Sequence, residues 1–94
     1  MKEIVNNTAE LCEYLKGLVI DTLKLDDVTK EEIENDAPLF GEGLGLDSID
    51  ALELVVALEK AFDVVIEDEN VGKTAFASIV TLAAFIQAKY KDRE

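Results

Sequence analysis

The sequence predicts an all-α fold: a small four-helix bundle of three main helices and one short helix, with a long loop between the first and second helices. Apolar residues recur at helical spacing near residues 8–23, 48–62 and from 79 onward. Residues 63–66 look like a short strand because they are rich in β-branched residues, but no partner strand is evident. Ninety-four residues, 49% of them hydrophobic, suffice for one core, so we expect residues 1–94 to form a single domain.

The first helix is predicted to span Thr8–Leu23. Asn7, followed three residues later by Glu10, is typical of a capped helix start. The apolar stripe of this helix consists of Leu11, Leu15, Leu18, Val19 and Leu23. Cys12 lies on the same stripe, which favours a plain buried thiol, and the chain has no histidine that could activate it as a nucleophile.

Residues 24–45 form the long loop, which contains Pro38 and three glycines. We expect its apolar side chains to pin it to the core; these are Ile33, Leu39, Phe40 and Leu44. Long loops in compact domains are often functional.

The central helix is predicted to span Ser48–Phe62. Asp47 is a suitable N-cap, and Asp50 adds a second carboxylate at the positive end of the helix. Ser48 is then the first helical residue, and its hydroxyl lies beside backbone N–H groups that have no intrahelical partner. A phosphate is well accommodated there, so Ser48 is suited to carry a phosphodiester.

Two apolar faces appear when the central helix is projected at about 100° per residue. The core face contains Ala51, Leu54, Val55, Leu58 and Phe62. A second stripe contains Ile49, Leu52 and Val56, on the side of Ser48 and bordered by Glu53 and Glu59. Either the loop at 37–45 covers this stripe, or the stripe is an exposed docking surface ringed by acids.

The C-terminal third is predicted to contain a connection and two helices. Residues 63–66 form the connection, with Ile66 buried. Glu67 or Asp68 can cap a short helix that runs through Val71 and ends at Gly72. Ser78 caps the last helix, whose apolar face contains Ile79, Leu82, Ala83, Phe85 and Ile86. Lys89, Lys91 and Arg93 place positive charge at its C-terminal end.

The formal net charge of −12 disfavours binding to nucleic acid or to anionic membranes and favours basic protein partners. No apolar run has the length of a membrane span, and the first residues lack the pattern of a signal peptide. The single cysteine excludes an internal disulfide. We therefore expect a soluble, cytoplasmic monomer without stable membrane association.

Three local patterns indicate no chemistry. Residues 41–46 lack the third glycine of a dinucleotide fingerprint and follow no strand, and residues 72–74 lack the first glycine of a P-loop. The acidic pairs do not fit an EF-hand, so we expect no specific metal site. Without a histidine or a base-flanked nucleophile, the chain is not expected to be an enzyme.

Residues 44–50 (LGLDSID), followed by 53–59 (ELVVALE) and 62–66 (FDVVI), resemble an acyl carrier protein of the phosphopantetheine-binding family. The resemblance extends over roughly residues 11–90. It implies that Ser48, next to Asp47, receives 4′-phosphopantetheine from coenzyme A through a phosphopantetheinyl transferase. The thiol of this arm would hold acyl groups as thioesters.

The resemblance also implies a docking surface and an acyl pocket. Partners would be the transferase and acyl-transferring, condensing or acyl-activating enzymes with basic docking surfaces. The docking residues would be Ile49, Asp50, Glu53, Val56 and Glu59. The candidate pocket residues are Leu52, Leu58, Val71 and Phe76. The loop at 38–43 is longer and richer in glycine than is usual in the family, and Glu67 stands where a proline is common.

Other classes of protein stay open. Peptidyl or aminoacyl carriers usually have two adjacent glycines before the serine, whereas Gly45 stands alone, which favours an acyl carrier. An unmodified acidic interaction module or a small calcium-binding protein would have a similar composition. Fatty acid, polyketide and specialised lipid biosynthesis are all compatible with the sequence.

Overall fold

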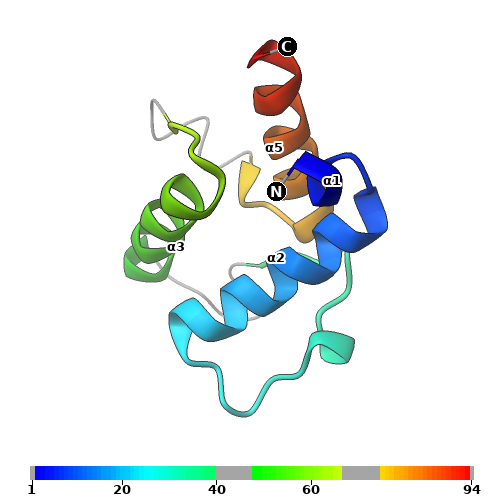
Figure 1. The fold of residues 1–94 in the computed structure, drawn as a ribbon. Helices are drawn as coiled ribbons and strands as arrows, with labels where there is room; N and C mark the ends of the chain where they lie inside the picture. Colours follow the sequence, from blue (N-terminus) through cyan, green and yellow to red (C-terminus); the bar gives the residue numbers. More distant parts are fainter. Residues whose placement is uncertain (1, 40–47, 67–74, 94) are drawn as a thin grey trace.

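The computed structural model describes residues 2–39, 48–66 and 75–93, in which helices and irregular segments occur and no strand does (Figure 1). The elements are α1 (Lys2–Val5), α2 (Thr8–Leu23), the short 3₁₀ helix η1 (Lys30–Glu32), α3 (Ser48–Phe62) and α5 (Ile79–Arg93). This confirms the predicted helical bundle with a long loop before α3. The short helix predicted to end at Val71 lies outside the described residues.

Helix α2 is the central element, because it packs against α1, η1, α3 and α5 (Figure 1). Its predicted cap is confirmed: the backbone N–H of Glu10 donates to Asn7 Oδ1 at 3.2 Å. The helix ends at Lys24, which has a φ of 53°, and the backbone N–H groups of Lys24 and Leu25 both bond to the carbonyl of Ile20. These caps satisfy groups that the ends of a helix leave without partners.

The core lies where α2, α3 and α5 meet. Its buried side chains from these helices are Leu11, Cys12, Leu15, Val19, Leu54, Leu58, Phe62, Ile79, Leu82, Ala83 and Ile86. The predicted core positions Ala51 and Val55 are half-buried. The predicted apolar face of each main helix therefore faces the core.

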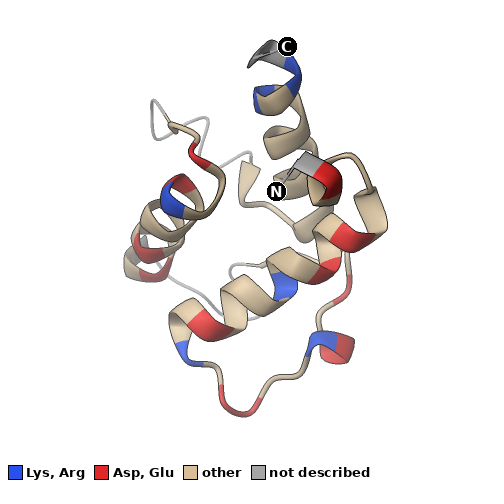
Figure 2. Cartoon of the chain, viewed as in Figure 1, with Lys and Arg blue, Asp and Glu red and all other residues tan. Residues whose placement is uncertain are grey.

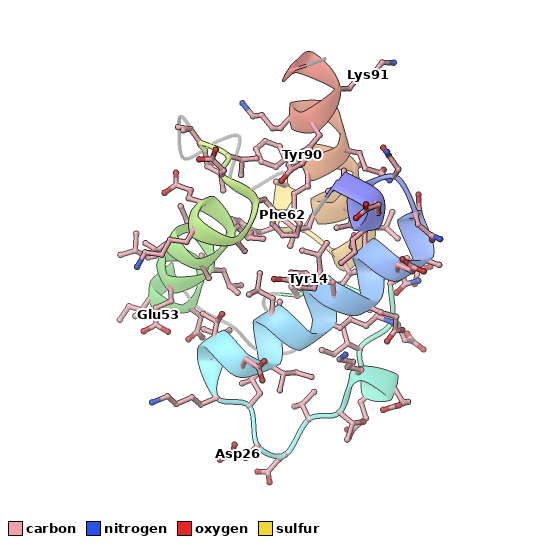
Figure 3. The ribbon with its side chains drawn as sticks, viewed as in Figure 1. Tyr14, Asp26, Glu53, Phe62, Tyr90 and Lys91 are labelled. Carbon is pink, nitrogen blue, oxygen red and sulfur yellow. The ribbon has the colours of Figure 1, made fainter. Side chains whose placement is uncertain are left out.

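Three aromatic rings fasten the C-terminal end of α3. Tyr14 of α2, Phe62 of α3 and Tyr90 of α5 point toward one another (Figure 3). The ring of Phe62 makes edge-to-face contacts with Tyr14 at 5.5 Å and with Tyr90 at 6.4 Å between centroids. The hydroxyl of Tyr90 also donates to the backbone carbonyl of Phe62 at 2.8 Å. This end of α3 is therefore held from two neighbouring helices at once.

The loop before α3 is tied to the start of α5. The backbone N–H of Leu39 donates to the carbonyl of Ala77 at 3.1 Å, and that of Val80 donates to the carbonyl of Asn35 at 2.8 Å. Ile33 and Leu39 are buried, as predicted, whereas Phe40 and Leu44 lie outside the described residues. The loop is thus fixed to the bundle up to residue 39.

Residues 63–66 form an irregular connection, as predicted. Asp63 has a φ of 54°, which ends α3. Val64 is the buried residue, whereas Ile66, which was predicted to be buried, is only partly so. Val65 is exposed, because successive side chains of an extended segment point in opposite directions.

Helix α1 was not predicted and is fastened by the far end of the chain. Val5 is buried, and the amide of Gln87 on α5 donates to the carbonyl of Val5 and to Thr8 Oγ1, each at 3.0 Å. Ser78 caps α5 as predicted, since its hydroxyl accepts from the backbone N–H of Thr81 at 3.2 Å. Gln87 of α5 therefore joins the C-terminal helix to α1 and to the start of α2.

The thiol of Cys12 is buried, as predicted, and burial raises its pKa, while nearby Lys16 acts in the opposite direction. Little reactive thiolate is therefore present near neutral pH. We expect an aromatic disulfide reagent at pH 8 to label Cys12 slowly in the native protein and rapidly in denaturant. Rapid labelling of the native protein would contradict this placement.

Gln87→Ala should destabilise the fold by about 1–2 kcal/mol, because two hydrogen bonds that join α5 to α1 and α2 are lost. Gln87→Glu should cost more, since a carboxylate cannot donate to the carbonyl of Val5. Denaturant unfolding followed by circular dichroism measures both values. Lys91→Ala on the exposed side of α5 is the control and should stay within about 0.5 kcal/mol of the parent. Equal stabilities for Gln87→Ala and this control would show that the two hydrogen bonds of Gln87 do not stabilise the fold.

Candidate functional site

The candidate site is the N-terminal end of α3. Ser48 is the first residue of this helix, and Asp50 lies in its first turn. The side chain of Ser48 and the whole of Asp47 lie outside the described residues. The first backbone N–H groups of a helix and its macrodipole make this end favourable for a phosphate. Ile49, the residue after Ser48, is 69% exposed, so solvent reaches its side of the first turn.

The second apolar stripe of α3 is exposed. Ile49, Leu52 and Val56 are 69%, 65% and 44% exposed, respectively. They account for three of the five large hydrophobic side chains that stand exposed in the described part of the chain; the other two are Val65 and Val80. We call Ile49, Leu52 and Val56 the α3 strip. None of the neighbouring elements that the structure describes buries the α3 strip, and such a patch is typical of an interaction site.

The predicted acidic residues around the α3 strip have different surroundings. Glu53 is exposed and points away from the core (Figure 3). Asp50 is half-buried. Glu59 is also half-buried, and its Oε2 accepts the backbone N–H of Ile66 at 3.1 Å. Glu59 therefore holds the connection after α3, a structural role that the sequence did not indicate.

The structure does not bring the predicted pocket residues together. Leu58 and Phe76 are buried in the core, whereas Leu52 belongs to the exposed α3 strip, and Val71 lies outside the described residues. Leu52 and Leu58 are six positions apart, so at about 100° per residue they point to different sides of α3. Leu52 thus lies on a different side of α3 from Leu58, and the acyl pocket of Leu52, Leu58, Val71 and Phe76 stays a prediction.

The surroundings of the site are acidic and offer no evident cluster of metal ligands among the described residues. Figure 2 shows acidic residues on α1, α2, η1 and α3, in keeping with the formal charge of −12. Within residues 2–39, 48–66 and 75–93, no three acidic or cysteine side chains gather in a way that could hold a metal ion. None of the helices described is both long and apolar enough to span a bilayer.

Comparisons with known proteins agree with this geometry. The family model described as "Phosphopantetheine attachment site" matches residues 13–86, which include Ser48 and the α3 strip. The acyl carrier protein of Buchnera aphidicola subsp. Acyrthosiphon pisum (strain Tuc7) is 43% identical over 61 residues, covering 65% of this chain and 71% of that protein. The acyl carrier protein of Thermosynechococcus vestitus is 40% identical over 67 residues, covering 71% and 78%, respectively. The chain therefore belongs to the acyl carrier protein family, whose members are carriers rather than catalysts and whose cofactor is 4′-phosphopantetheine.

Proposed function

We propose that Ser48 is the attachment residue for 4′-phosphopantetheine and that residues 1–94 form one carrier domain. The observation that carries the proposal is the position of Ser48 at the start of α3, next to the exposed α3 strip and within the matched family region. When attached, the arm supplies a thiol that holds acyl groups as thioesters. The enzymes served would belong to fatty acid, polyketide or specialised lipid biosynthesis.

Attachment needs a separate phosphopantetheinyl transferase. The chain has no histidine to serve as a base for the hydroxyl of Ser48. The serine oxygen forms the new bond to phosphorus, the hydroxyl proton passes to a base of the transferase, and the nucleotide half of coenzyme A leaves. The N-terminal end of α3 contributes a positive field next to the phosphodiester.

Recognition by partners is assigned to the outer face of α3. The α3 strip offers a small apolar centre, and Glu53 and Asp50 place acidic groups in the same half of the helix as Ser48. A partner that covers the strip brings its active site to Ser48. The net charge of −12 favours partners with basic docking surfaces. We expect the transferase and the acyl-transferring, condensing or acyl-activating enzymes to share this contact.

Ser48→Ala should fold normally and take up no arm when incubated with coenzyme A and a phosphopantetheinyl transferase. Intact-protein mass spectrometry measures the modification. Ser78→Ala is the control, because Ser78 is the only other serine in the chain and caps α5. It should lower stability by about 1 kcal/mol and still be modified. Modification of Ser48→Ala would refute the attachment site, and an unmodified parent chain would favour an acidic interaction module.

Glu53→Lys should slow association with the transferase and weaken its salt dependence, because rim charges act mainly by steering. Val56→Ala should instead speed dissociation by roughly 3–10-fold, equivalent to about 1 kcal/mol, through the loss of apolar contact. Stopped-flow binding gives the two rate constants.

The matched control for Val56→Ala is Val80→Ala, because Val80 is equally exposed (43% against 44%) but lies on α5. Both variants should keep nearly the parent's Tm. A Val56→Ala variant that loses roughly 1–3 kcal/mol of stability and binds with unchanged kinetics would assign Val56 to the core and exclude the docking role.

A further inference from the structure

The outer face of α3 carries one basic residue. Lys60 is the only lysine or arginine in this helix, and it is exposed in the last turn. It follows Val56 by four residues and Glu53 by seven, so these three side chains lie on one side of the helix. Lys60 therefore stands at the end of the α3 strip that is farther from Ser48.

The acidic residues near Lys60 do not neutralise it directly. Glu59 is half-buried and accepts the backbone N–H of Ile66, and Asp63 lies beyond the last residue of α3. Among the residues that the structure describes, neither carboxylate forms an ion pair with Lys60. Lys60 is thus the one basic residue on this face of α3, with exposed Asp63 just past the helix end, whereas Asp50 and Glu53 place only acidic groups near the Ser48 end.

The two ends are far enough apart to be recognised separately. Asp50 and Lys60 are ten residues apart, which is about 15 Å along a helix. The Debye length at physiological ionic strength is about 8 Å, so a partner charge at one end is largely screened from the other. Lys60 also complements the dipole at the C-terminal end of α3, an effect on stability that does not depend on any partner.

We propose that Lys60 makes the charge on the docking face of α3 asymmetric, with acidic groups near Ser48 and a basic group at the other end. This face would then select enzymes that have basic residues opposite the Ser48 end and an acidic or neutral residue opposite Lys60. The inference rests on the proposed carrier function. An enzyme whose docking surface is basic along its whole length would meet repulsion at Lys60, so Lys60 is a specificity-determining residue.

The test uses a bacterial phosphopantetheinyl transferase whose docking surface is basic throughout, with coenzyme A as co-substrate. The kcat/KM of modification is measured for the parent chain, Lys60→Glu, Lys60→Gln and Lys91→Glu over a salt series. Lys91→Glu is the matched control: it makes the same charge change at an exposed lysine near the C-terminal end of α5, away from Glu53 (Figure 3). Its expected change is less than about 2-fold at low salt.

Lys60→Glu should raise kcat/KM by roughly 3–10-fold at low salt, Lys60→Gln should give an intermediate increase, and the differences should shrink as salt is added. Equal values for Lys60→Glu and Lys91→Glu, or a decrease for Lys60→Glu, would overturn the inference while modification of Ser48 still supports the carrier function. A parent chain that is not modified would overturn both. Melting curves verify that each variant is folded. If Lys60→Glu is not folded, the kcat/KM of Lys60→Gln decides whether the inference holds.

Discussion

The burial of the inner face of α3 against α2 determines how the candidate site is presented. Leu54, Leu58 and Phe62 lie on that face and are buried, and each such burial contributes roughly 1.5–3 kcal/mol. Since the side chains of a helix have fixed angular positions, seating these three residues also sets the direction of the α3 strip. The direction in which the α3 strip faces therefore depends on packing in the core.

The two ends of α3 have different supports. At Phe62, ring contacts with Tyr14 and Tyr90 and a hydrogen bond to the backbone carbonyl hold the helix, and aromatic pairs of this kind add about 0.5–1.5 kcal/mol each beyond the area they bury. Glu59 fixes the connection that follows. A helix anchored at its far end can present Ser48 at the other end without the serine being part of the core.

Local signals explain what the sequence could predict. The bounds of α2 and α3 and the cap at Ser78 follow from periodicity and capping residues, which act within a few positions. Helix α1 was missed because its four residues depend on Gln87, more than eighty positions away. The exposure of Leu52 could not be decided either, because a helix with two apolar stripes does not reveal which stripe its neighbours cover.

An exposed apolar strip on so acidic a chain has a physical rationale in the charges around it. Leaving Ile49, Leu52 and Val56 in water forgoes the stability that their burial would give, which is understandable if a partner covers them transiently. The strip alone would also favour contact between two copies of the chain. A net charge of −12 opposes that contact, and the same acidic groups attract basic partners. In the proposed docking role, charge decides which proteins can use the apolar contact, and Lys60 at one end of the α3 strip is proposed to narrow the set of partners further.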